Sequence, residues 1–169
     1  MNEKNLKEKT EILSEVISLT ASLYERKGLT SLQKAFLETL IGAGIWYLPK
    51  DKNVLFSGKI SKLALAQLQI DPKNTKLVEE HGKYPRKVSG RALYTEYLDE
   101  IRKDGSRLVE LYLNEMGKFN YVLKIENTRL SRFQRTDKFI DEETAYRLAG
   151  IEMVAITLEE VNRLLRRKE

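Results

Sequence analysis

The chain has 169 residues, of which 41% are apolar and 33% charged, as expected for a globular protein with a heavily charged surface. It contains no cysteine and only one histidine, which excludes disulfides and the usual cysteine- and histidine-built zinc sites. The net charge of +5 favours a polyanionic partner, although a solvated surface of mixed charge explains it equally well.

The first residues of the chain argue against export and against a membrane span. The segment 1–16 is charged throughout and has no apolar signal core. Elsewhere no apolar run reaches the roughly 18 residues that a membrane helix needs. We therefore expect a cytoplasmic location and no membrane partner.

The N-terminal part reads as a helical hairpin over residues 1–48. Apolar residues recur at three- and four-residue steps over 3–26, which predicts an amphipathic helix. Thr30 and Gln33 have the spacing of a capping box that opens a second helix over 31–45. This hairpin could cap the rest of the chain or pair with another copy.

The remaining chain, 49–169, reads as one compact mixed domain in which strand signals are interspersed with short helices. The middle contains Gly82 and Pro85, which predict irregular backbone over 82–88. The other expected elements are a short strand at 54–56, a helix at 60–69, an extended segment at 75–81, helices at 89–103 and 106–116, a strand at 119–123, helices at 125–135 and 142–149, a strand at 151–156 and a last helix opened by Thr157 and Glu160. The fold class is therefore α+β and mostly helical.

The segment around the single histidine has the residue types that phosphodiester hydrolysis requires. Glu80 directly precedes His81, and basic residues follow on both sides of Pro85. Neutral imidazole can take a proton from water near neutral pH. On an extended chain the neighbouring carboxylate points the other way, so it could bind a cation while the histidine faces the water.

A second informative segment lies about 45 residues further along the chain. The alternating strand that begins at Phe119 leads into a helix that carries Glu126, Asn127 and Leu130. An asparagine at a junction of strand and helix can orient a histidine through its side-chain carbonyl. Asparagine near a helix start is also a common cap, and both readings stay open.

Together these residues resemble the HNH, or ββα-metal, nuclease family over roughly residues 77–140. The resemblance implies a small ββα-metal-like core, with His81 as general base and Asn127 as the residue that positions it. It also implies that Glu80 is a ligand of Mg²⁺ or Mn²⁺. The family's third residue on the last helix, usually histidine or asparagine, is replaced here, and we expect Gln134 in its place, with Asp137 as the alternative.

Two basic clusters lie near these segments and could contact phosphates, since arginine forks suit phosphate oxygens. A solvated charged face is the competing reading for each cluster. The candidate nucleic-acid-binding residues are Lys83, Arg86, Lys87, Arg91, Arg129, Arg132, Arg135 and Lys138.

Three functions follow as hypotheses. The first is a metal-dependent endonuclease of restriction, phage or mobile-element type that acts on double-stranded DNA, with a homodimer expected if its target is palindromic. The second is a nucleic-acid-binding protein in which His81 is only one half of a surface pair with Glu80. The third is a protein-interaction or inhibitor module built on the N-terminal hairpin.

Overall fold

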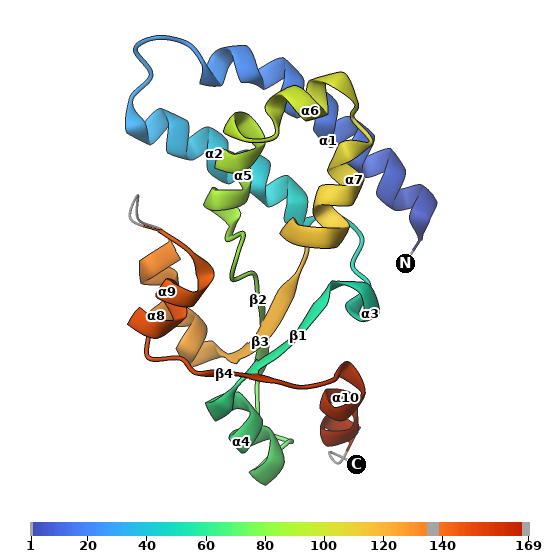
Figure 1. The fold of residues 1–169 in the computed structure, drawn as a ribbon, viewed down its shortest axis with the longest axis vertical. Helices are drawn as coiled ribbons and strands as arrows, with labels where there is room; N and C mark the ends of the chain where they lie inside the picture. The colour runs from blue at the N-terminus through green and yellow to red at the C-terminus, as the bar shows by residue number, and fades with distance from the viewer. Residues whose placement is uncertain (1, 135–138, 167–169) are drawn as a thin grey trace. The chain divides into compact units, whose positions relative to one another are not determined.

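The computed structural model describes residues 2–134 and 139–166, which form two compact units. A helical unit consists of residues 1–51 and 84–117, and a sheet unit consists of residues 52–83 and 118–169. The α+β, mostly helical fold class is confirmed (Figure 1). The expected boundary near residue 48 lies close to Asp51, where the first segment of the helical unit ends, but residues 84–117 return to that unit.

The helical unit is built on the expected N-terminal hairpin. Thr30 accepts the backbone N–H of Gln33, whose side chain in turn accepts the N–H of Thr30, so the expected capping box is present. The hairpin packs against the helices that follow Pro85. The helices of this unit are α1 (Glu3–Tyr24), α2 (Ser31–Trp46), α5 (Arg86–Thr95), α6 (Leu98–Lys103) and α7 (Arg107–Leu111), which continues as the π-helical turn η1 (Tyr112–Met116).

Helices α2 and α5 cross so closely that each needs a glycine at the contact. A Cβ atom on Gly42 would lie 1.7 Å from the carbonyl oxygen of Arg86, and one on Gly90 would lie 1.8 Å from that of Glu38. Since neither backbone can yield without separating the helices, these glycines set the crossing distance.

Two expectations for this unit are wrong in detail. The segment expected to be irregular, 82–88, already enters α5 at Arg86. The single helix expected over 89–103 is divided between α5 and α6, because the chain turns where the N–H of Tyr97 bonds to the carbonyl of Ala92. The apolar periodicity continues across this turn, and so the pattern did not reveal it.

The sheet unit contains a four-stranded mixed sheet in the order β2-β3-β1-β4 (Figure 1). Strand β3 lies parallel to β1 and antiparallel to β2, while β4 is antiparallel to β1. The strands are β1 (Phe56–Ser61), β2 (Leu77–Glu80), β3 (Phe119–Leu123) and β4 (Met153–Ala155). The helices are α3 (Lys52–Leu55), α4 (Lys62–Ile70), α8 (Lys124–Gln134), α9 (Glu142–Leu148) and α10 (Leu158–Arg166).

The strand expected at 54–56 is wrong, because Lys52–Leu55 forms the short helix α3 and the strand begins at Phe56. The sequence also predicts a connection that runs up to Gly58, yet Ser57 and Gly58 lie inside β1. Gly58 has a φ of +83°, and the register with β3 shifts between Phe56 and Ile60. A bulge at Gly58 therefore keeps this polar stretch within the sheet.

Strands β2 and β3 and helix α8 follow one another in the ββα order that the family resemblance implies, with residues 84–117 inserted between the strands. Helix α8 packs on β2 and β3 and also against α9. Tyr146 of α9 contributes to an apolar cluster with Leu130, Ala145, Ala149 and Ile151. This packing brings two helices to the strand that carries Glu80.

Candidate active site

The side chains of β2 alternate between the two faces of the sheet. Glu79 pairs with Tyr121 of β3, and Glu80 pairs with Asn120. Because successive residues of a strand point to opposite faces, the chain separates these two pairs. Glu80 and Asn120 face α8 and α9, as their hydrogen bonds show.

The carboxylate of Glu80 lies buried between the two helices. Only 4% of Glu80 is exposed. Gln134 of α8 donates from Nε2 to Oε1 of Glu80 at 2.6 Å, and the hydroxyl of Tyr146 donates to Oε2. The sequence-predicted pair Glu80 and Gln134 is therefore brought together.

Asn120 links Tyr146, one of the two partners of Glu80, to a second carboxylate. Its Nδ2 lies 2.7 Å from Oε1 of Glu142 and 2.6 Å from the hydroxyl of Tyr146, and donates to both. The hydroxyl of Ser57, on β1, donates to Oδ1 of the same asparagine. Two carboxylates, two amides and two hydroxyls thus form one polar cluster on this face of the sheet.

The local sequence explains how α9 presents its two members of the cluster. Asp141 caps the helix by accepting the N–H of Thr144 at 2.7 Å, which places Glu142 in the first turn. At the other end Gly150 has a φ of +66°, and the N–H of Ile151 bonds to the carbonyl of Tyr146 at 2.9 Å. This Schellman-type end fixes Tyr146 one turn before the stop.

Burial raises the pKa of Glu80 to about 7, and the negative charge of Glu142 raises it too. The hydrogen bonds from Tyr146 and Gln134 act in the opposite direction by stabilising the carboxylate, without cancelling the effect of burial. Burial, followed by the charge of Glu80, raises the pKa of the Tyr146 hydroxyl, so Tyr146 remains a hydrogen-bond donor. Glu80 is therefore poised to bind either a proton or a cation near neutral pH.

His81 follows β2 and is 7% exposed. Its Nδ1 lies 2.9 Å from the backbone carbonyl of Lys118, and because a carbonyl can only accept, Nδ1 must carry the proton. In the neutral ring the lone pair is then on Nε2. A backbone carbonyl therefore orients the ring.

Gly82 brings Glu142 close to the segment that carries His81. A Cβ atom on Gly82 would lie 2.4 Å from Oε1 of Glu142, so glycine leaves room for this carboxylate in its present position. Glu142 therefore packs directly against the backbone that follows Glu80 and His81.

Asn127 lies in α8, three residues after its first residue, and is half-buried, so it does not occupy the cap position. Its neighbour Glu126 is fully buried and accepts hydrogen bonds from Ser61 Oγ at 2.5 Å and from the N–H of Leu123 at 2.8 Å. Glu126 thereby ties the start of α8 to β1. The role of Asn127 stays a prediction.

Three of the predicted basic residues belong to the helical unit, where they contact other side chains. Arg91 Nε lies 3.1 Å from the buried carboxylate of Glu38, and Lys87 Nζ lies 3.8 Å from it. The guanidinium of Arg86 lies 4.4 Å from the ring centroid of Trp46. These contacts stabilise the helical unit. They also engage three of the cationic groups that were expected to contact phosphate.

The other predicted basic residues belong to the sheet unit. Lys83, Arg129 and Arg132 are exposed. Arg129 lines a shallow pocket beside α4, and Arg132 lines a different one beside α9. Arg135 and Lys138, like Asp137, lie outside the described residues.

Sequence reasoning missed four members of the cluster. Ser57 was assigned to a connection, and Tyr146 and Glu142 were seen only as helix residues. Asn120 carried the one usable signal, because asparagine is depleted in strands and its presence within an apolar one indicates a polar partner. Their meeting depends on how β1, β3 and α9 pack, which no local pattern shows.

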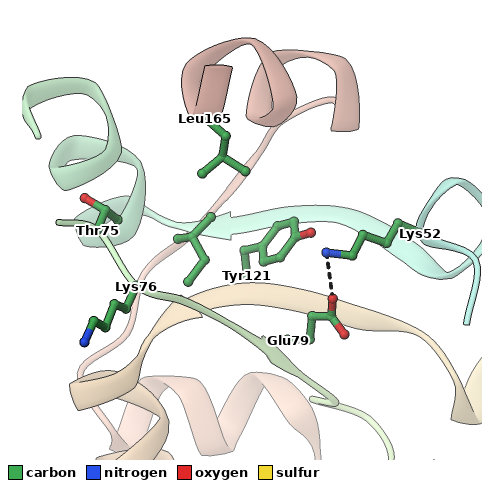
Figure 2. A pocket seen from close by; sticks show the side chains of 7 residues that line it. Lys52, Thr75, Lys76, Glu79, Tyr121 and Leu165 are labelled. Carbon is green, nitrogen blue, oxygen red and sulfur yellow. Dashed lines mark ion pairs between the residues drawn. The ribbon is translucent and has the colours of Figure 1, made fainter. Parts of the chain in front are cut away.

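The opposite face of the sheet carries an open pocket of about 490 Å³, shown in Figure 2. Lys52 Nζ lies 3.1 Å from a carboxylate oxygen of Glu79 and 5.9 Å from the ring centroid of Tyr121. Leu165 of α10 lines the same pocket. Glu79 is thus half-buried and paired with a lysine, whereas Glu80 is buried on the other face.

Among the described residues, no group of three or more histidine, cysteine, aspartate or glutamate side chains is arranged to hold a metal ion. In the same part of the chain, no helix has the length and apolar character needed to cross a lipid bilayer. Comparisons with protein-family models, with curated proteins and with solved structures found no match.

We expect Tyr146→Phe to destabilise the protein by about 1–3 kcal/mol at pH 8, because a buried oxygen of Glu80 loses its donor and Asn120 Nδ2 loses one of its two acceptors. The loss should be smaller at pH 5, where Glu80 is protonated and its hydrogen bonds are weaker. Urea unfolding at the two pH values measures it. Tyr47→Phe, at an exposed tyrosine, should change neither value, and an equal loss at both pH values would contradict the assignment.

Proposed function

We propose that this chain is a metal-dependent nuclease that hydrolyses phosphodiester bonds of double-stranded DNA. The observation that carries the proposal is the meeting of Glu80 with Gln134, at 2.6 Å, across a β2-β3-α8 unit. The resemblance to HNH nucleases expects an acidic residue at the end of one strand and a ligand on the helix in this relation. His81 follows Glu80 directly; its ring is oriented by the carbonyl of Lys118, and its centroid lies 6.5 Å from that of Phe119.

The donors of the cluster suit a hard divalent cation. Glu80 and Glu142 supply carboxylate oxygens, and the amide of Gln134 presents its oxygen after rotation about its last bond. Mg²⁺ and Mn²⁺ prefer such oxygen ligands. Glu80 would hold the cation, with Gln134 and Glu142 beside it. When bound, the cation supplies positive charge that stabilises the leaving oxygen of the phosphodiester.

His81 acts as the general base in this proposal. Its Nε2 takes a proton from water, whose oxygen attacks phosphorus, and the bond from phosphorus to the leaving oxygen breaks. The carbonyl of Lys118 keeps the proton on Nδ1 and so keeps the accepting lone pair on Nε2. Lys83, Arg129 and Arg132 remain the proposed contacts to the phosphate backbone in this unit.

A plasmid cleavage assay tests the proposal. We expect the protein to nick or cut supercoiled DNA with Mg²⁺ or Mn²⁺, to lose activity with a chelator, and to lose about 10²–10⁴-fold in rate in His81→Ala. Glu79→Gln, beside Glu80 but on the other face of the sheet, is the matched control and should retain activity.

The same protein samples separate the nuclease from a binding protein without catalysis. If the wild type cuts no DNA with either ion but shifts DNA on a gel, with an affinity that falls steeply as salt is added, it is the binding protein. If it neither cuts nor shifts DNA, both nucleic-acid functions are wrong.

A further inference from the structure

Helix α1 has a second apolar stripe on the side opposite to its buried face. The buried face is formed by residues such as Ile17 and Ala21. The second stripe repeats at steps of four, three and four residues, the spacing of a coiled-coil seam, and Leu19 within it is 77% exposed. Its members are Ile12, Val16, Leu19 and Leu23.

Helix α2 carries a matching stripe. Leu32, Phe36 and Leu40 lie four residues apart, and Phe36 is 67% exposed. The buried positions of α2, such as Ile41 and Ile45, lie on the other side of the helix. Since α5, α6 and α7 pack against the buried sides of α1 and α2, the two exposed stripes lie on the outer face of the hairpin.

This outer face is larger than an ordinary exposed apolar patch. At about 150–200 Å² for a large apolar residue, the exposed fractions of the seven side chains amount to roughly 600–800 Å². A typical monomer exposes patches of roughly 300–600 Å² at most. A stable interface buries about 800 Å² on each partner, which is close to what this face offers.

We propose that the outer face of α1 and α2 binds a second copy of this chain, with the two α1 helices antiparallel about a two-fold axis. A two-fold interface requires a face that complements itself, and the four-three-four stripe, centred between Val16 and Leu19, meets this requirement. Antiparallel pairing in register places Ile12 of one copy opposite Leu23 of the other.

The charges beside the stripe favour the same arrangement. Glu8 and Glu15 are exposed near its N-terminal half, and Arg26 and Lys27 are exposed just beyond its C-terminal end. In the register that sets Ile12 opposite Leu23, antiparallel helices bring Glu8 of one copy next to Lys27 of the other. The interface is thus a layer of four helices, two from each copy.

Sedimentation equilibrium of the full chain tests this proposal without nucleic acid, so its outcome is independent of nuclease activity. We expect a dimer whose dissociation constant rises at least about 30-fold in Leu19→Glu and in Phe36→Glu. Ile70→Glu is the matched control, because Ile70 is as exposed but lies on α4, and it should leave the dimer intact. Circular dichroism checks that each variant is folded.

A charge exchange tests the antiparallel direction. Glu8→Lys and Lys27→Glu should each weaken the dimer, and the double variant should recover it. A wild type that is monomeric at all concentrations, and so leaves the face to a different protein, overturns the proposal. A dimer that neither Leu19→Glu nor Phe36→Glu weakens overturns it equally, because another face would then form the interface.

Discussion

Replacing Glu80 by glutamine is expected to make the protein more stable at pH 8 and to end its metal-dependent cleavage of DNA. The two effects share one cause, because the buried carboxylate is costly to ionise and its charge is what would hold the cation. Glutamine keeps an oxygen for Tyr146, and Gln134 can rotate its amide to accept from the new side-chain NH₂. The hydrogen bonds are thus kept while the charge is removed.

The direction of the pH dependence follows from the raised pKa. With a pKa of about 7 in the folded protein against 4.5 in the reference state, the folded protein binds more protons than the unfolded chain between these values. Stability therefore falls as pH rises from about 4.5 to about 7, by roughly 3 kcal/mol at most. Glu80→Gln should lack this fall, so its gain in the free energy of unfolding appears at pH 8 and vanishes at pH 4.

Urea unfolding across this pH range measures the effect, with Glu79→Gln as the control that keeps the wild-type profile. A wild-type stability that does not fall between pH 5 and pH 8 would show that Glu80 ionises freely in the fold. Added Mg²⁺ should restore wild-type stability at pH 8 and leave Glu80→Gln unchanged. If Glu80→Gln instead cleaves DNA at the wild-type rate, Glu80 is not a metal ligand.

The parts of the fold that depend on local signals were predictable from the sequence. The capping box at Thr30 and Gln33, the cap at Asp141 and the stop at Gly150 each involve residues a few positions apart. The alternation around Tyr121 correctly indicated β3. These signals act within one turn or one strand, and so the sequence displays them directly.

The candidate site depends on contacts between distant segments, and only part of it was predictable. The acidic and imidazole side chains at residues 80 and 81 were identified because their chemistry is unusual at adjacent positions. Gln134 was found through the family resemblance, and it does contact Glu80. By contrast, the hydroxyl of Tyr146 and the amide of Asn120 reach the site only through the packing of α9 on α8 and the register of β3 with β2.

The predicted basic residues also show that contacts between distant segments cannot be inferred from local sequence. Arg91 and Lys87 looked like one surface cluster with the histidine segment, but the buried Glu38 pairs with both. Glu38 lies in α2 and is only 3% exposed. A carboxylate far away in the sequence thus converts part of a presumed phosphate-binding cluster into a structural ion-pair network.

Gly42→Ala is expected to destabilise the helical unit by about 3 kcal/mol or more, at the upper end of what overpacking a core costs. The added Cβ would lie 1.7 Å from the carbonyl oxygen of Arg86, and a backbone atom at the start of α5 can move only if the two helices separate. Because alanine is a better helix former than glycine by about 1 kcal/mol, the measured loss in stability will be smaller than the free-energy cost of the clash itself.

Gly44→Ala provides the matched comparison, because it lies two residues further along the same helix and gains the same helix propensity. Its Cβ would meet the end of the Leu13 side chain at 2.7 Å, and that side chain can rotate away. Thermal unfolding should therefore show a large loss for Gly42→Ala and a change within about 1 kcal/mol for Gly44→Ala. Equal effects at the two positions would mean that α2 and α5 do not cross at Gly42, and that this glycine pair serves some purpose other than close helix packing.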